Sequence, residues 1–300
     1  MDLEGFESIR RLLGELKLLT RSQNTELTYL KGIKAFLKYC GATNPDMLIE
    51  EMKNDTNTAN EKFKGFVIDL ASKSLAPKSV AAWAAGVRKF LSANGIPVSN
   101  VPIKVYTLHE DMLPTKEDLK KVLETASSKA RVCLLILLSS GLRIGELYNL
   151  TIKDVNLDED PAIIRVKAVS AKERKGRITF MSQQAKEALK AYLANRNLEE
   201  LTPDSPLISA DNGKPMSYQN LQYILNNAFK KVGKKVGKRY TLHAHTLRKW
   251  FKTQMISAGI PGPIVDRLMG HSRYLAEEYE LYTESQLREW YLKGVTSLTI

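Results

Sequence analysis

Residues 139–147 of the chain, with the sequence SSGLRIGEL, contain an arginine in a position suited to phosphate binding. Arg143 follows a glycine turn and precedes a predicted helix, and the N-terminus of a helix favours anions. Glu146 lies three residues later, where its carboxylate can pair with the arginine. The segment therefore predicts either a phosphate-binding arginine or an ordinary helix-capping turn with an Arg–Glu pair on the surface.

Residues 243–250, with the sequence HAHTLRKW, contain a second group of this kind. His245 and Arg248 are three residues apart, so on a helix they share one face and can converge on one phosphate. The chain has only 4 histidines, and no carboxylate lies near these two in sequence to complete a set of metal ligands. The remaining alternatives are a phosphate site and a helix face with a buried histidine.

A third histidine and several tyrosines follow near the C-terminus. His271 belongs to the sequence LMGHS at the end of a predicted short helix, and Tyr274, Tyr279 and Tyr282 follow within eleven residues. Taken singly, such a histidine is more often structural and such tyrosines more often belong to a core. These residues gain meaning from their order along the chain, and no single motif specifies a function.

The charge of the chain indicates a polyanionic partner. Its formal net charge is +12, and lysines and arginines that replace condensed counterions draw a protein to nucleic acid. No acidic residue occurs between Asn212 and Val265, a stretch that surrounds His245 and Arg248. The basic residues within it are Lys214, Lys230, Lys231, Lys234, Lys235, Lys238, Arg239, Arg248, Lys249 and Lys252.

In order, the motifs are GLRxxEL, a lysine in a predicted β-hairpin turn, HxLR, LMGHS and a tyrosine. This order resembles the tyrosine recombinase, or phage integrase, family over Arg143 to Tyr282. The stretch from Tyr279 to Lys293 is most similar to integrases of archaeal viruses and plasmids. The resemblance implies a site-specific DNA recombinase that requires neither a metal ion nor another cofactor.

The resemblance also implies a role for each residue. Arg143 and Arg248 would bind the non-bridging phosphate oxygens with bidentate geometry. His245 would orient or deprotonate the nucleophilic tyrosine, and His271 would donate a further hydrogen bond to the phosphate. The tyrosine, activated by these cations, would form a 3′-phosphotyrosine and release a 5′-hydroxyl. Attack by the 5′-hydroxyl of a partner strand would then rejoin the DNA without ATP.

The lysine departs from the family pattern. It is usually the first lysine of a Gly-Lys-Gly-x-Lys turn, a place that Val169 takes here. Lys172 is the predicted leaving-group acid because it is nearest the centre of the turn, with Lys175 and Lys167 as alternatives.

The nucleophile is the second open assignment. Tyr279, eight residues beyond His271, is closer to the usual offset of the family than Tyr282, which lies eleven residues beyond. The archaeal-type Tyr-x-x-x-Thr-Glu pattern also favours Tyr279. Tyr282 remains the alternative because the Tyr282-Thr283 pair imitates a common ending in the family.

The first part of the chain is predicted to form a helical domain. Residues 25–39, 60–72 and 78–94 have apolar side chains at the spacing of amphipathic helices. Residues 95–114 contain Gly95 and three prolines with little periodicity, which is typical of a linker. We therefore predict a helical core-binding, DNA-binding domain at 1–98, by its match in size, charge and position to that of the family, and a linker at 99–114.

A second, catalytic domain is predicted at 115–300. Thr115 and Asp118 form a helix-start pattern, and helices follow at 116–127 and 131–139. Two β-rich segments, 162–169 and 176–181, flank a polar turn and predict a hairpin. The remainder is mostly helical. The predicted fold class is mainly α: a small helical domain and a larger, α+β catalytic domain with a small antiparallel sheet.

The predicted partner is double-stranded DNA at a specific attachment or recombination site, bound by a homotetramer. The tail from Ser285 to Ile300 has an apolar face suited to docking on a neighbouring subunit with tail exchange, or on its own domain; the face comprises Leu287, Trp290, Tyr291 and Leu292.

The longest apolar run, Val132 to Leu138, is too short to span a membrane, and no secretory signal is recognised. Cys40 and Cys133 match no disulfide or zinc pattern, which predicts a cytoplasmic protein.

Two other functions compete with recombination. A type IB topoisomerase-like enzyme would use the same residues as a monomer, and the apolar tail argues against it. A non-catalytic, sequence-specific DNA-binding protein would not need the complete Arg/Lys/His/Arg/His/Tyr series. DNA cleavage in EDTA would separate an enzyme of this kind from a binding protein.

Overall fold

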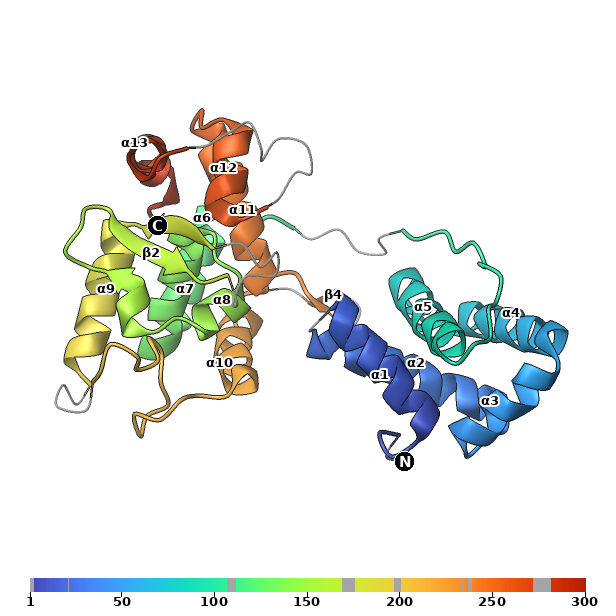
Figure 1. Cartoon of the computed structure of the whole chain (residues 1–300). Coiled ribbons are helices and arrows are strands. Elements are labelled where there is room, and N and C mark those ends of the chain that lie inside the picture. Colours follow the sequence, from blue (N-terminus) through green and yellow to red (C-terminus); the bar gives the residue numbers. More distant parts are fainter. Residues whose placement is uncertain are drawn as a thin grey trace. The chain divides into compact units, whose positions relative to one another are not determined.

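The computed structural model describes residues 3–20, 22–106, 112–168, 176–196, 201–233, 235–236, 239–271 and 282–300 (Figure 1). The chain divides into two compact units, an N-terminal unit of Met1–Glu110 and a C-terminal unit of Asp111–Ile300. The order of elements agrees with the predicted fold class, which is confirmed: the chain is mainly helical with a small antiparallel sheet.

The N-terminal unit is helical throughout its described elements. These are α1 (Glu7–Leu19), α2 (Gln23–Tyr39), α3 (Pro45–Asn54), α4 (Thr56–Ser72) and α5 (Pro77–Ala93). The three helices predicted from periodicity correspond to α2, α4 and α5. Helix α3 is not among the helices predicted from periodicity. Asn44 caps this helix by accepting hydrogen bonds from the backbone N–H groups of Asp46 and Met47, at 2.8 and 3.2 Å, and Pro45 is its first residue.

The core of the N-terminal unit forms where α2 and α5 pack together. Their approach is close because glycines face the partner helix: a Cβ on Gly32 would lie 2.9 Å from the backbone of Trp83, and one on Gly86 would lie 2.9 Å from that of Tyr29. Such contacts leave no room for a larger side chain. A core cluster of buried apolar side chains closes around this pair of helices and is separate from the core of the C-terminal unit.

The C-terminal unit combines helices with two small antiparallel sheets. Its described elements are α6 (Lys116–Thr125), α7 (Ser128–Ser140), α8 (Ile144–Tyr148), η1 (Ile152–Asp154), β1 (Val155–Asn156), β2 (Ala162–Val166), β3 (Arg177–Met181), α9 (Gln183–Ala194), α10 (Tyr218–Lys230), β4 (Lys235–Val236), β5 (Arg239–Tyr240), α11 (Ala244–Ser257), α12 (Gly262–Met269), α13 (Glu284–Gly294) and η3 (Val295–Leu298). The predicted start of α6 is confirmed: Thr115 and Asp118 form a capping box.

Helix α7 lies at the centre of this unit. It packs against α9, α10, α11 and β3 (Figure 1), and every residue from Val132 to Ser140 is buried. The longest apolar run of the sequence therefore lies in the core of the unit. Among the described residues, no helix has the length and hydropathy that crossing a membrane requires.

The predicted β-hairpin is present as the antiparallel pair β2 and β3, and β1 extends it to three strands. The register pairs Ala162 with Met181 at one end and Val166 with Arg177 at the other. The polar turn predicted between these strands falls largely on residues 169–175, which the structure does not describe. Lys172 and Lys175 therefore lie outside the described residues.

The C-terminal tail packs on its own unit. Leu287 and Tyr291 of α13 are buried, and the Tyr291 hydroxyl donates a hydrogen bond to the Ser139 carbonyl at 2.9 Å. Ion pairs join Glu284 to Arg165 at 3.1 Å and Arg288 to Glu159 at 2.8 Å. Of the two alternatives for the apolar face of the tail, docking on its own domain is the one observed in this structure.

Candidate active site

Arg143 lies in a sharp turn between two helices. Helix α7 ends at Gly141, whose φ of 64° is left-handed, and a Cβ there would lie 2.6 Å from the ring of Phe251. Only glycine fits both conditions. Helix α8 then begins immediately after Arg143, so the guanidinium is attached at a helix N-terminus, where anions bind favourably.

The predicted pair between Arg143 and Glu146 is confirmed, although it is not on the surface. The Arg143 backbone N–H donates to Glu146 Oε2 at 2.7 Å, and its Nη1 donates to Oε1 at 2.9 Å. The Glu146 side chain is 1% exposed, whereas that of Arg143 is 24% exposed. The arginine therefore stands between a buried carboxylate and the surface.

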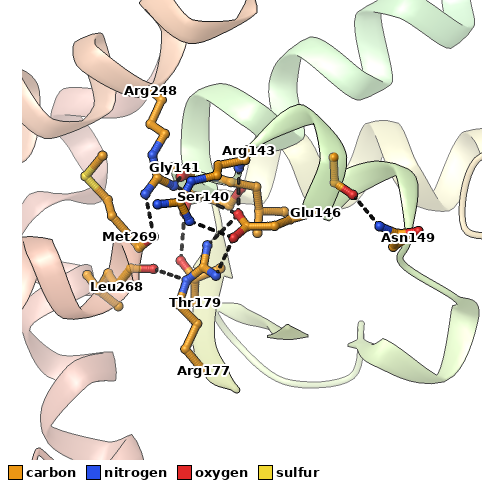
Figure 2. A network of polar contacts seen from close by, with 12 residues as sticks. Ser140, Gly141, Arg143, Glu146, Asn149, Arg177, Thr179, Arg248, Leu268 and Met269 are labelled. Atoms are coloured by element: carbon orange, nitrogen blue, oxygen red, sulfur yellow. Dashed lines mark hydrogen bonds and ion pairs between the residues drawn. The ribbon is translucent and has the colours of Figure 1, made fainter. Parts of the chain in front are cut away.

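Arg177, the first residue of β3, is the partner that sequence reasoning missed. Its Nη1 and Nη2 donate to Glu146 Oε1 and Oε2, both at 2.8 Å, in a bidentate ion pair (Figure 2). The Arg177 side chain is 3% exposed. A sequence signal did exist, since an arginine in a mostly apolar strand requires a charged or hydrogen-bonding partner where it is buried.

Arg248 of α11 completes a cluster of three arginines around one carboxylate. Its Nη2 donates to the Met269 carbonyl at 2.6 Å and its Nη1 to the Gly141 carbonyl, while Nη1 is 4.0 Å from Glu146 Oε2. Burial, and next the charge of Arg143, lower the pKa of Arg248 to about 9. Arg248 therefore remains cationic at neutral pH.

The cluster carries more positive than negative charge. Burial of Glu146 favours its neutral form, but hydrogen bonds and charge from Arg177, with a smaller contribution from Arg143, hold the pKa of its carboxyl below the usual value. One carboxylate thus faces the guanidiniums of Arg143, Arg177 and Arg248. An arrangement of this kind favours an additional anion, and a phosphodiester has the required charge and acceptor oxygens.

His271 lies next to this cluster. It follows Gly270, whose φ of 66° ends α12, and its Nδ1 is 3.3 Å from Asp266 Oδ1. Burial, and next the charge of Arg248, lower the pKa of His271, so its ring is neutral at pH 7. A phosphate bound beside Arg248 would offset that charge and favour the protonated ring, which donates from both nitrogens.

His245 has a different environment from Arg248, although the two lie on one helix. It is the second residue of α11 and is exposed. Its ring stacks on that of His243 with centroids 6.3 Å apart. The two side chains that were predicted to share one face therefore differ in burial. Arg248 lies in the buried arginine cluster, whereas His245 is exposed at the start of the helix.

For the predicted catalytic lysine and nucleophilic tyrosine, the structure describes only the alternative residues Lys167 and Tyr282. Lys172 and Tyr279 lie outside the described residues. The alternative Lys167 is held by Asp154, with Nζ 2.9 Å from Oδ2. The alternative Tyr282 is partly buried against the core of the C-terminal unit, directly before the Thr283 cap of α13. Within the described ranges, no three histidine, cysteine, aspartate or glutamate side chains group as metal ligands.

Glu146→Gln is expected to lower the free energy of unfolding by about 3 kcal/mol at pH 7, because the buried Arg177 loses its charged partner. The folded-state pKa of Glu146 is lowered. The stability that its carboxylate contributes is therefore present above the usual glutamate pKa of about 4.3 and is lost as the pH falls through the folded value. The difference between wild type and variant should shrink at low pH.

Urea unfolding at pH 7 and pH 3 measures this difference. Glu284→Gln is the matched control, because Glu284 also pairs with an arginine, at 3.1 Å, but is 34% exposed; its substitution should cost less than about 1 kcal/mol. An equal loss for Glu146→Gln at both pH values would contradict an ionised Glu146.

Comparison with known proteins identifies the family. Residues 114–287 match the family model described as "Phage integrase family". This segment is more than half of the chain, so the chain belongs to the phage integrase family. The predicted class, a tyrosine recombinase, is confirmed by this match and by the names of its relatives.

Two curated relatives illustrate the similarity. The tyrosine recombinase XerC of Leptospira interrogans is 26% identical over 304 residues, which cover 96% of this chain and 93% of the relative. The tyrosine recombinase XerA of Pyrococcus horikoshii is 30% identical over 177 residues, or 58% of each chain.

Solved structures share the fold. The Tn1549 transposon integrase, in complex with a circular intermediate DNA, has a TM-score of 0.67 and 18% identity, with 95% of this chain and 98% of that chain covered. A lambda integrase tetramer bound to a Holliday junction has a TM-score of 0.66 and 16% identity, with 92% and 79% covered.

Proposed function

We propose that this protein is a site-specific recombinase that cuts and rejoins DNA through a 3′-phosphotyrosine on Tyr279. The observation that carries the proposal is the cluster of Arg143, Arg177 and Arg248 around the single carboxylate of Glu146. In a member of the phage integrase family, such an excess of positive charge suits the phosphate at which a strand is cleaved.

The reaction exchanges one phosphodiester for another. The Tyr279 oxygen attacks phosphorus, the bond to the 5′-oxygen breaks, and Lys172 protonates that oxygen as it leaves. His245 orients the tyrosine or accepts its proton. The reverse attack, by the 5′-hydroxyl of a partner strand, releases the tyrosine, so neither ATP nor a metal ion enters the balance.

The phosphate is held by groups of unequal exposure. Arg143 is the more accessible arginine and contacts the non-bridging oxygens, while the buried Arg248 adds charge behind it. His271 donates a further hydrogen bond once its ring is protonated. Charge that builds on these oxygens in the transition state is stabilised by groups that are already fixed, which is the most effective form of such catalysis.

Double-stranded DNA is the proposed substrate, and a homotetramer is the proposed assembly. The solved complexes of Tn1549 integrase with DNA, and of a lambda integrase tetramer with a Holliday junction, support this extension. Residues 1–98 would form the core-binding domain, 99–114 the linker and 115–300 the catalytic domain. An origin in an archaeal virus or plasmid, and action in the cytoplasm, complete the proposal.

The test is to trap the covalent intermediate. The protein is incubated in EDTA with nicked duplex DNA from its own replicon, and the digested product is searched by mass spectrometry for a nucleotide-bearing peptide. An adduct on Tyr279 supports the proposal. Tight, specific binding without any adduct would overturn it in favour of a DNA-binding protein.

A further inference from the structure

Arg177 links the three parts of the C-terminal unit that carry the proposed site. It is the first residue of β3 and pairs with Val166 at the end of the hairpin nearest the turn. The proposed acid, Lys172, precedes it by five residues. Arg177 therefore lies at the end of β3 that is nearest the proposed acid in sequence, and its side chain points into the protein.

The contacts of the guanidinium reach two other elements. Its Nη1 and Nη2 bind Glu146 of α8, both at 2.8 Å, and its Nε donates to the Leu268 carbonyl of α12 at 3.0 Å (Figure 2). The side chain also packs against Gly270, where an added Cβ would lie 2.7 Å from Arg177 Cδ. One residue thus fixes α8, which follows Arg143, and the turn that precedes His271.

The Glu146 carboxylate is shared between two arginines. Oε1 accepts from Arg143 Nη1 and Arg177 Nη1, while Oε2 accepts from the Arg143 backbone and Arg177 Nη2. Without Arg177, the carboxylate would be free to bind the Arg143 guanidinium in a bidentate way and draw it inward. Its uncompensated negative charge would also oppose an approaching phosphate.

We propose that Arg177 is a positioning residue for strand cleavage. It holds and neutralises Glu146, so that Arg143 and His271 face the phosphate. This inference rests on the proposed function. The expected consequence is large because reacting groups displaced by about 1 Å lower a rate by about 100-fold.

Arg177→Lys tests the role while keeping the charge. Single-turnover cleavage of a nicked duplex at saturating DNA should be about 100-fold slower, because a lysine cannot make the bidentate pair. The DNA concentration at half-saturation should change by less than about threefold, since many other phosphate contacts determine affinity. Arg165→Lys is the matched control, an exposed arginine on the neighbouring strand β2, and should cleave at the wild-type rate.

A second variant separates positioning from stability. Replacing both partners, as Arg177→Met with Glu146→Leu, removes the two charges of this ion pair together. The buried Arg248 keeps its hydrogen bonds to the Gly141 and Met269 carbonyls, so the variant should fold. Its cleavage should remain about 100-fold slow, because the contacts of Arg177 with the Leu268 carbonyl and Gly270, which fix the segment before His271, are lost in this variant as well. The defects of both variants should persist on DNA with a sulfur in place of the 5′-oxygen, a leaving group that needs no acid.

The outcomes assign the role. Wild-type cleavage by folded Arg177→Lys would overturn it, as would recovery on the sulfur substrate, which would place the effect at the lysine turn. The wild-type reaction run in parallel separates two failures. An adduct from wild type with an unaffected variant overturns the role of Arg177 alone, whereas no adduct from wild type overturns the proposed function and this role with it.

Discussion

Tyr279→Phe should abolish the covalent protein–DNA adduct while DNA affinity stays within about threefold of wild type. Phenylalanine keeps the ring but lacks the oxygen that would bond to phosphorus, so the covalent intermediate cannot form. Binding should be unaffected because the basic groups that we propose contact phosphates are unchanged. Denaturing gel electrophoresis of the nicked-duplex reaction measures the adduct, and a gel-shift titration measures affinity.

Tyr282→Phe is the matched control for this experiment. Tyr282 is partly buried against the core of the C-terminal unit and directly precedes the cap of α13, a position that suits packing. Its substitution should cost about 1 kcal/mol of stability or less and leave the adduct in place. The reverse pattern, with adduct lost in Tyr282→Phe and kept in Tyr279→Phe, would assign the nucleophile to Tyr282.

Arg143→Ala should lower the single-turnover cleavage rate by about 10²–10³-fold, the usual effect of removing one donor to a developing oxyanion. Arg143 is the most exposed of the three clustered arginines and is attached at the start of α8. Arg177 still neutralises Glu146 in this variant, so the fold should persist. Quench-flow or manual-quench assays at saturating DNA measure the rate.

Arg288→Ala provides the comparison for Arg143→Ala. Arg288 is 27% exposed and pairs with Glu159 at 2.8 Å, against 24% and 2.9 Å for Arg143 and Glu146. The two substitutions remove similar side chains from the same unit, yet only Arg143 lies in the cluster. Equal effects on cleavage would show that the loss is general to ion pairs of this unit and would contradict a phosphate-binding Arg143.

Local structure could largely be predicted from the sequence. The capping box of Thr115 and Asp118 and the amphipathic patterns of α2, α4 and α5 depend on residues close together in the chain. Helix α3 was not predicted, because the asparagine and proline at its start are common both in turns and at the first positions of a helix. Only the hydrogen bonds of Asn44 distinguish the two.

For the C-terminal tail, the surface that covers its apolar face could not be predicted from the sequence. Its apolar spacing predicts a buried face but does not specify what covers that face. In the folded chain, Leu287 and Tyr291 are covered by the unit to which they belong. The partner of an amphipathic helix depends on which surfaces come together, and residues far apart in sequence make those surfaces.

The sequence by itself determined the family, the order of the motifs and the pair of Arg143 with Glu146, because these depend on residue type and short spacing. Only the tertiary structure decided which arginine is exposed and which one is buried against Glu146. Arg177 meets Glu146 across 31 residues and the Leu268 carbonyl across 91. No local pattern encodes such contacts: they arise because the core brings β3, α8 and α12 together, and a buried charge is stable there only beside its partner.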